Sequence, residues 1–320
     1  MKNFKLLTLL FLFSIKSWSY CEAFPKNNIW NTKITNAPLH KNSKLWLDSL
    51  GLKKIHPDFG SPTFYRPFIG IPINYTNQFT QKYSVQFTYK EESDKQAYPI
   101  PFNVKIEGGS LSTGDRHIIS IDTDTCLLYE LFNAHRSKNG QWTAGSGAIF
   151  DLKSNDLRPL GWTSADAAGL PIYPGLVKYH ELASGTINHA LRFTIPKTSK
   201  NFIWPARHFA SKKNDQSLPP MGMRLRLKSS FNINVLSPQA KVIAKTLQEY
   251  GMILADNGGA LFITGEPNEN WDNDGLRDLK QLNTHDFEVV DVFQWQKSQN
   301  SAEASLIKSK ILEKLRVKHN

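Results

Sequence analysis

Cysteine is scarce in this sequence of 320 residues, which contains only Cys21 and Cys126. Two cysteines cannot build a structural zinc site, and the histidine spacings contain no zinc-binding motif. The sequence also lacks the glycine-rich phosphate loop, the dinucleotide fingerprint and the Gly-x-Ser-x-Gly turn of serine hydrolases. No nucleic-acid recognition motif is present, so we do not expect nucleic acid as a partner.

Long hydrophobic runs are also missing. The apolar run from Leu6 to Ile15 has about ten residues, whereas a helix that crosses a membrane needs roughly 20. Lys2 and Lys5 precede this run and small residues follow it, which is typical of a signal peptide. We therefore expect residues 1–23 to be a signal peptide of a protein that is exported to the periplasm or secreted, with no transmembrane segment.

The position of signal cleavage decides the state of the cysteines. Cleavage after Ser19 would leave Cys21 in the mature chain, where it could pair with Cys126 in an oxidising compartment. Cleavage after Ala23 would remove Cys21. Ala23 offers the better cleavage site, so we expect Cys126 to be a lone, buried thiol.

Acidic residues are outnumbered, with 28 Asp and Glu against 39 Lys and Arg, and the formal net charge is +11. The excess is local. Residues 192–228 contain nine basic residues and one acidic residue, a balance of +8, whereas residues 266–291 contain eight acidic and two basic residues, a balance of −6. An acidic polymer is therefore an expected partner.

Strand periodicity places three of these cations on one strand face, because residues two apart point the same way. If acidic strands face them, they are paired internally. If not, they form a groove for a carboxylate- or sulfate-bearing polymer, which arginine binds bidentately. The three are Arg224, Arg226 and Lys228.

Alternation of apolar and polar residues predicts strands through most of the chain. His117–Asp122 and Thr125–Phe132 are expected to form a hairpin. Helices are expected at Ser43–Leu50 and from Pro238 to Gly251. The other expected strands are Ser84–Tyr89, Gly175–Tyr179, Thr186–Ile195, Gly222–Ser230, Met252–Ala255, Ala260–Thr264 and Phe287–Val292.

This pattern predicts a mainly β fold, an antiparallel β-sandwich or jelly roll with a few peripheral helices, with α+β as the alternative. We expect residues 24–300 to form a single β-rich domain. Residues 301–320 carry apolar residues at helical spacing with cations between them, which predicts a basic amphipathic helix.

Three ionisable side chains fall on apolar strand faces, where an unpaired charge would be costly. His117 shares a face with Ile119 and Ile121, and Glu130 and His189 have similarly apolar neighbours. One interpretation is a polar network within the core, with every group hydrogen-bonded. The other is a cleft in which burial tunes these groups for proton transfer.

The long segment 151–174 predicts a functional loop. Asp166 and Trp162 in this loop, with Trp142 upstream, would suit a sugar site, where an aromatic face stacks on the ring and a carboxylate binds hydroxyls. Another aromatic residue and two groups that can carry positive charge follow at Trp204, Arg207 and His208.

A metal site is not expected. Residues 270–275 fit the first half of a calcium loop, but position twelve is Gln281 in place of the bidentate glutamate. We therefore expect Asp272 and Asp274, the residues of a low-probability calcium site, to cap the following short helix.

Several motifs resemble those of a family of exported bacterial proteins with no assigned activity. The resemblance covers most of the chain after residue 23, and its most distinctive part is GWTSADAAGLP, residues 161–171. It implies export and a shared site, but no reaction. The other motifs are GDRH (114–117), LYEL (128–131), WTAGSGA (142–148), HALRF (189–193) and WPARH (204–208).

The function expected from these patterns is action on a polysaccharide. In a glycoside hydrolase, Glu130 or Asp166 would be the general acid, and Asp115 or Glu130 would be the base or nucleophile.

In a polysaccharide lyase, Arg192 or Arg207 would neutralise a sugar carboxylate while His189 or His117 removes the neighbouring proton. The alternatives are a non-catalytic glycan-binding protein, with the three tryptophans as stacking platforms, and a structural protein of the cell envelope.

Overall fold

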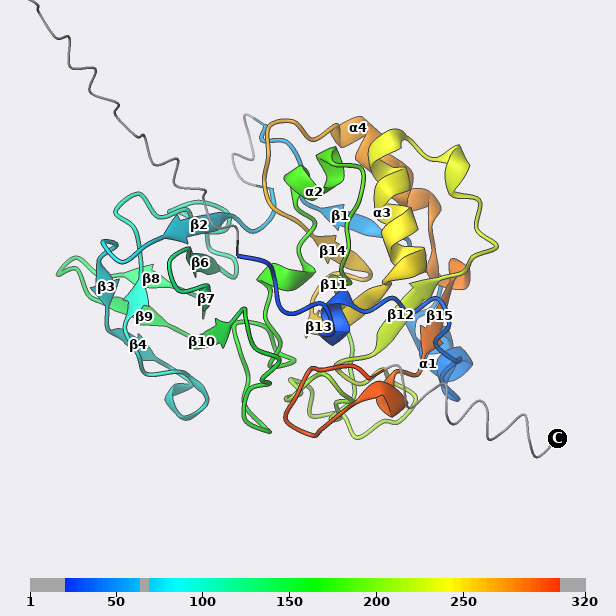
Figure 1. The fold of residues 1–320 in the computed structure, drawn as a ribbon, viewed down its shortest axis with the longest axis horizontal. Helices are drawn as coiled ribbons and strands as arrows, with labels where there is room; N and C mark the ends of the chain where they lie inside the picture. Colours follow the sequence, from blue (N-terminus) through cyan, green and yellow to red (C-terminus); the bar gives the residue numbers. More distant parts are fainter. Residues whose placement is uncertain (1–20, 64–68, 306–320) are drawn as a thin grey trace, which may run out of the picture.

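β-Strands make up most of the regular structure, and helices are few (Figure 1). The computed structural model describes residues 21–63 and 69–305. Its strands are β1 (His56–Asp58), β2 (Ile73–Thr76), β3 (Lys82–Tyr83), β4 (Val85–Phe87), β5 (Tyr98–Pro99), β6 (Ile118–Asp122), β7 (Leu127–Phe132), β8 (His135–Arg136), β9 (Trp142–Ala144), β10 (Ser146–Asp151), β11 (Leu191–Ile195), β12 (Arg224–Leu227), β13 (Met252–Asn257), β14 (Phe262–Thr264) and β15 (Phe287–Val290). Its α-helices are α1 (Ser43–Leu50), α2 (Tyr179–Ala183), α3 (Pro238–Glu249) and α4 (Asn273–Leu276). Its 3-10 helices are η1 (Ile29–Asn31), η2 (Lys90–Glu92), η3 (Tyr173–Gly175), η4 (Ile233–Val235), η5 (Arg277–Gln281), η6 (Thr284–Asp286) and η7 (Phe293–Trp295).

The larger sheet has six strands in the order β1-β14-β11-β13-β12-β15. β11 pairs with β13 in parallel, whereas β12 runs antiparallel to both of its neighbours. All five residues of β11 are buried. A strand covered on both faces lacks the alternation of a half-exposed strand, so Arg192 enters the interior together with its apolar neighbours.

The second sheet, in the order β10-β7-β6-β2, lies in the other lobe of the molecule (Figure 1). Its hairpin of β6 and β7 is the predicted one. Asp122 closes the turn, because its Oδ1 accepts the N–H groups of Asp124 and Thr125, both at 3.1 Å. Two small sheets, β3-β5 and β4-β9-β8, complete this lobe.

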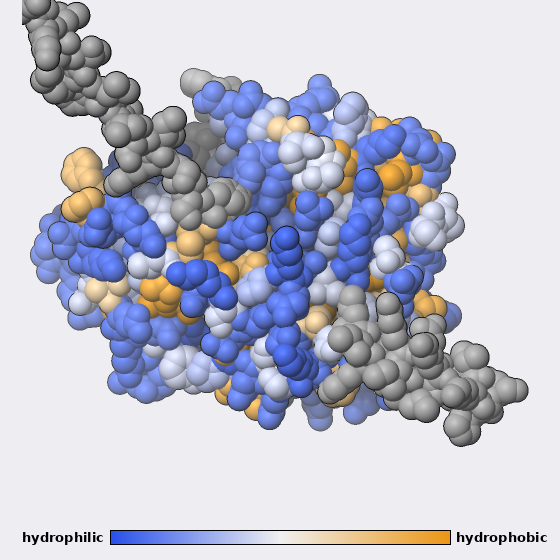
Figure 2. Space-filling model, in the orientation of Figure 1, coloured by the Kyte–Doolittle hydropathy of each residue, from blue (hydrophilic) through white to orange (hydrophobic). Residues whose placement is uncertain are grey.

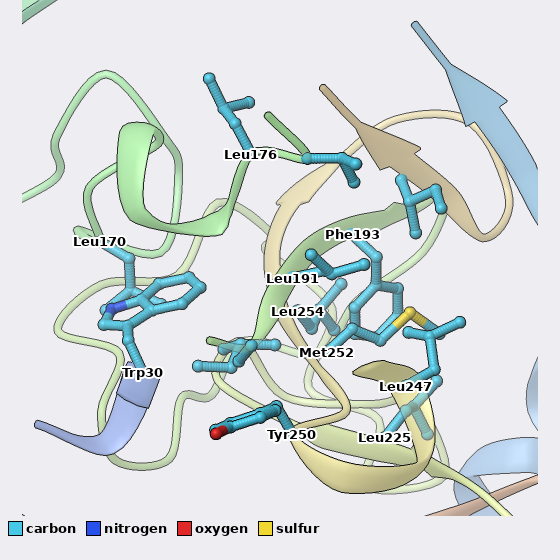
Figure 3. Close-up of a cluster of buried hydrophobic side chains, with 14 of the residues drawn as sticks. Trp30, Leu170, Leu176, Leu191, Phe193, Leu225, Leu247, Tyr250, Met252 and Leu254 are labelled. Atoms are coloured by element: carbon cyan, nitrogen blue, oxygen red, sulfur yellow. The ribbon is translucent and has the colours of Figure 1, made fainter. Parts of the chain in front are cut away.

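One buried apolar cluster includes residues of both large sheets, such as Leu128 of β7 and Phe193 of β11. Figure 3 shows part of it, where Phe193 lies beside Met252 of β13 and Leu247 of α3. A second cluster, which includes Leu131, occupies the opposite face of the β6–β7 hairpin. Hydrophilic residues cover most of the molecular face in Figure 2.

The expectation of antiparallel sheets is wrong for four strand pairs, β1 with β14, β2 with β6, β4 with β9, and β11 with β13, which are parallel. Apolar periodicity shows how a strand is exposed but not which way its partner runs, because parallel partners are joined by long connections. The mainly β character is confirmed. The sandwich or jelly-roll arrangement stays a prediction.

Most expected elements are present, although the strands are shorter than the sequence indicated. Two expectations are wrong. Gly175–Tyr179 is not a strand: Gly175 ends η3, Tyr179 begins α2, and residues 176–178 connect them. The strand expected at Thr186–Ile195 begins only at Leu191. In both cases the buried apolar residues lie in loops or short helical turns. Their spacing in the sequence looks the same as that of a buried strand.

The ends of the chain depart from expectation where the structure describes them. Ser301, Glu303 and Ala304, at the start of the expected C-terminal helix, form isolated β-bridges. Residues 306–320, like residues 1–20 of the expected signal peptide, lie outside the described residues. The division of the chain at residues 23 and 300 stays a prediction. In the described part of the chain, no helix has the length and apolarity needed to cross a membrane.

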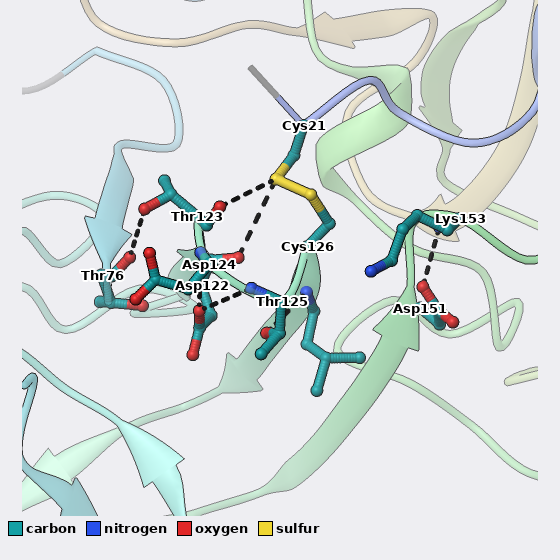
Figure 4. Close-up of a disulfide and its surroundings, with 10 residues drawn as sticks. Cys21, Thr76, Asp122, Thr123, Asp124, Thr125, Cys126, Asp151 and Lys153 are labelled. Atoms are coloured by element: carbon teal, nitrogen blue, oxygen red, sulfur yellow. Dashed lines mark hydrogen bonds between the residues drawn. A yellow bond between two sulfur atoms is a disulfide. The ribbon is translucent and has the colours of Figure 1, made fainter. Parts of the chain in front are cut away.

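The expectation of a lone thiol at Cys126 is wrong, because Cys21 and Cys126 form a disulfide (Figure 4). Their Cα atoms lie 5.4 Å apart, and 105 positions separate them in the sequence. Cys21 lies beside the β6–β7 turn, so the pairing follows from tertiary packing that local patterns do not reveal.

This bond predicts that the protein carries no free thiol. Alkylation of denatured protein should label no cysteine without reductant and two after reduction, as measured by mass spectrometry. Labelling of one cysteine without reductant would contradict the pairing. Because the bond closes a loop of 105 positions, the variant C21A/C126A should lose about 2–4 kcal/mol of unfolding free energy.

Candidate functional site

The β6–β7 hairpin holds Glu130 inside the molecule, with 0% of the residue exposed. Both carboxylate oxygens accept the N–H of Ile172 at 3.0 Å, and Oε1 also accepts the N–H of Tyr173 at 2.9 Å. Burial raises the pKa of Glu130 to about 7 against the lowering effect of these hydrogen bonds, and the charge of Asp166 adds to the increase. Glu130 therefore anchors the segment that leads into η3.

Asp166, from the long loop, is also fully buried. Its Oδ2 accepts the Nε–H of Arg192 at 2.8 Å, and its Oδ1 accepts a second bond from Nη2. Burial alone would lower the pKa of Arg192, but the charge and hydrogen bonds of Asp166 outweigh burial and raise it. Nη1 of the same guanidinium donates to Thr264 of β14. This fork ties the loop to the larger sheet.

The turn that presents Asp166 is built by its neighbours. The Oγ of Ser164 accepts the N–H of Asp166 at 2.9 Å and so caps a turn within the loop. Gly169 has a φ of +68°, and a Cβ there would collide with the carbonyl oxygen of Trp162. The shape of this turn therefore explains why the motif contains a serine at 164 and a glycine at 169.

His117 lies on the same side of the hairpin as Glu130. Its Nδ1 is 2.6 Å from Oε2 of Glu107, and its Nε2 is 3.2 Å from the carbonyl oxygen of Ala165. Burial would lower the pKa of His117, but the charge and hydrogen bond of Glu107 outweigh it and raise the pKa to about 9. At neutral pH both ring nitrogens donate, and the imidazolium is part of the core.

These groups form one buried network between the two large sheets. Asp256, at the end of β13, belongs to it, because burial and then the charge of Asp166 raise its pKa. The hydrogen-bonding atoms of Glu130 and Asp166 are occupied, so neither carboxylate is free to meet a substrate. The geometry therefore matches the interpretation as a polar network within the core.

Arg207 and His208 are also held by the protein itself. Arg207 donates to the carbonyl oxygens of Arg158 and Gln299, both at 2.7 Å, and to Oδ1 of Asn300 at 2.8 Å. His208 Nδ1 lies 2.8 Å from the carbonyl oxygen of Ala167. Arg207 thus ties the long loop to the C-terminal segment.

The three tryptophans do not meet on one surface. Trp204 is buried and donates its indole N–H to the carbonyl oxygen of Ser301 at 2.9 Å. Trp142 is buried in the second apolar cluster, and Trp162 is half-buried with Arg158 over its ring. Asp115, the remaining hydrolase candidate, is exposed.

The cations of β12, and Lys228 directly after it, are hydrogen-bonded within the protein. Arg224 is buried, and its guanidinium donates to the carbonyl oxygen of Tyr250. Arg226 bonds Glu288 of the neighbouring β15 at 2.8 Å, and Lys228 donates to a backbone carbonyl oxygen at 2.7 Å. Among the described residues, only Arg226 of the three has an acidic partner, so the internal pairing that the charge pattern allowed is found at that position alone.

Asp272 is the N-cap of α4, as expected. Its Oδ1 accepts the N–H groups of Asp274 at 3.1 Å and Gly275 at 3.0 Å. Among the described residues, no group of three or more metal-binding side chains is found.

His189 has different surroundings, beside an open pocket of about 590 Å³. Its Nε2 lies 3.1 Å from Nζ of Lys178 and 3.0 Å from Oε2 of Glu181, and its Nδ1 lies 2.8 Å from the carbonyl oxygen of Ala190. A carbonyl can only accept, so Nδ1 carries a proton. In the neutral ring, Nε2 is the basic atom.

Lys178 and Glu181 were not among the expected site residues. Lys178 is 1% exposed, and its ammonium lies 3.1 Å from both oxygens of Glu181. Burial raises the pKa of Glu181, but the charges of Lys178 and then His189 outweigh burial and lower it. The i,i+3 spacing of the pair at the start of α2 is the one sequence signal for it.

The pocket is walled by two parts of the chain that are distant in sequence. One wall is the segment 22–26 that follows Cys21, and Asn31 fixes this segment by donating to the carbonyl oxygens of Ala23, Phe24 and Pro25. The other wall comes from α2 and the loop before β11. The full lining is Glu22, Ala23, Phe24, Lys26, Asn31, Tyr173, Lys178, His180, Glu181, Ser184, Thr186, Asn188, His189 and Tyr250.

Comparison with known proteins identifies no relative of this chain. No protein-family model matches the chain, and searches of the curated proteins and of the solved structures returned no significant match.

The protonated His117 makes stability depend on pH. Its folded pKa of about 9 lies above the ordinary value of 6.5, so the stabilisation is complete below pH 6.5 and is lost as the pH rises through 9. Urea unfolding should give the wild type a higher unfolding free energy than the H117Q variant. This difference should be larger at about pH 6 than at about pH 9.5, by about 3 kcal/mol. The exposed-site variant H285Q should show no such change, and a pH-independent gap for H117Q would contradict the assignment.

Proposed function

We propose that the protein is exported, with signal cleavage before Cys21 as after Ser19, and cleaves an acidic polysaccharide by β-elimination in the pocket beside His189. The observation that carries the proposal is the contact of His189 with Lys178 and Glu181 at the wall of an open pocket. Of the four residues considered for a lyase, His117, Arg192 and Arg207 are bound to other protein groups, and His189 alone lines this pocket.

The reaction needs a base next to the carbon that carries the sugar carboxylate. Nε2 of His189 would take the proton from that carbon, and the C–H electron pair would form a double bond as the neighbouring C–O bond breaks. The leaving oxygen takes a proton from water, and His189 later releases its proton to water. The products are a new chain end and an unsaturated uronate.

The surrounding charges support this role. Nζ of Lys178 and Oε2 of Glu181 lie 3.1 Å and 3.0 Å from Nε2 itself. Both are positioning residues that fix the orientation and charge of His189, and a bound substrate must displace the ammonium of Lys178 from Nε2 before this atom can act as the base. Lys26 is exposed at the pocket and supplies a cationic group for the substrate carboxylate, and the exposed His180 lines the pocket beside it. Glycoside hydrolysis is less well supported, because Glu130 and Asp166 are engaged in the core network.

The test is incubation with polygalacturonate, alginate, hyaluronate and a neutral glucan. We expect ultraviolet absorbance from unsaturated product with at least one acidic polymer. H189Q should lower the rate at least about 100-fold, because general bases contribute that much or more. Circular dichroism and thermal melting show whether H189Q is folded.

H285Q is the matched control, because His285 is exposed and remote from the pocket lining. It should retain the full rate. Binding of a polysaccharide without new products would instead support the non-catalytic glycan-binding protein. Full activity of folded H189Q would overturn the proposed base.

A further inference from the structure

A second pocket lies on the lobe that contains β6 and β7. It is a cavity of about 330 Å³ that shares no lining residue with the pocket beside His189. Its walls come from β3, β8, β9 and the connection between β5 and β6. The lining residues are Tyr83, Ile100, Pro101, Phe102, Val104, Ile106, Ser110, Arg116, Arg136 and Trp142.

The charge of this pocket is one-sided, with two arginines and no acidic residue in the lining. Arg116 is only 6% exposed. Its Nε donates to the carbonyl oxygen of Ala134, and its Nη1 donates to those of Ser110 and Ser112, all at 2.9 Å. Among the described residues, its Nη2 has no hydrogen-bond partner and its guanidinium has no carboxylate partner. A buried cation without a counter-ion favours an anionic ligand.

The backbone at Arg116 is also unusual. Its φ is +52°, in the left-handed region that residues other than glycine seldom adopt. Such conformations concentrate at functional sites, where the surrounding structure holds them in place. Arg116 belongs to the GDRH motif, and the proposed elimination gives it no role.

Trp142 supplies a second unsatisfied donor. The residue is 3% exposed and lines the pocket, and its Nε1–H has no hydrogen-bond partner among the described residues. The exposed guanidinium of Arg136 lies 5.6 Å from the ring centre of Tyr83 and 5.9 Å from that of Trp142. The rings therefore hold Arg136 beside the same space.

We propose that this pocket binds an oxyanion carried on a sugar ring, such as a uronate carboxylate or a sulfate ester. Arg116 and Arg136 supply the donors for the oxyanion, since Arg forks suit such groups, and the ring of Trp142 lines the same pocket. Ile100, Val104 and Ile106 offer apolar surface to a ring face, and Phe102, 98% exposed, forms part of the rim. This binding site does not depend on the elimination reaction.

The test follows the indole N–H signals of the nitrogen-15-labelled full chain by NMR. The probes are methyl glucuronide, sodium sulfate and the uncharged methyl glucoside, and the W142F variant identifies the signal of Trp142. We expect a saturable shift of that signal with methyl glucuronide and none with methyl glucoside. R136A should weaken glucuronide binding at least about tenfold, as expected for losing a charge-assisted hydrogen bond.

R277A is the matched control, because Arg277 is an exposed arginine paired with Asp274 outside this pocket. It should leave glucuronide binding unchanged. The same shift in H189Q would separate this site from the first pocket. A response to sulfate alone would overturn the assignment to a sugar, and the absence of a Trp142 response to either anion would overturn the site.

Discussion

The ion pair of Asp166 and Arg192 is the interaction on which the interior depends. Both partners are buried, one in a loop and one in the middle of the larger sheet. Removing two charges from water is costly, and only a bidentate geometry with further hydrogen bonds compensates. Thr264 supplies such a bond. The long loop is thereby fixed between the sheets, and Glu130 binds its next segment through the backbone of Ile172 and Tyr173.

The same pair explains why several chemically suggestive residues are structural. Loss of one partner would leave an uncompensated charge in the core. Burial raises the pKa of Glu130 and of Asp256, whereas the charge and hydrogen bond of Glu107 outweigh burial and raise that of His117. Perturbed pKa values often mark active sites, but structural ion networks produce them as well. Exposure alone does not distinguish the two cases, because His189 is 4% and His117 3% exposed. The difference is that His189 lines an open pocket.

Part of this arrangement could be predicted from the sequence. Period-two spacing correctly placed His117 and Glu130 on the inner face of a hairpin, because that face is decided by residues close in sequence. It failed for His189, whose strand begins two residues later, and for the direction of β11, whose partner is encoded more than fifty residues away. Lys178 was missed because residues 175–179 were expected to form a strand, whereas Lys178 is the N-cap of α2, the helix that carries Glu181.

The disulfide links the pocket beside His189 to the redox state of the compartment that contains the protein. Segment 22–26 forms one wall of that pocket, and it enters the fold directly after Cys21. A reducing cytosol keeps thiols apart, whereas the periplasm and the exterior of the cell join them. The finished wall thus belongs to the oxidised protein, and a chain retained in the cytosol would hold the same residues without the covalent bond that fixes them beside the β6–β7 turn.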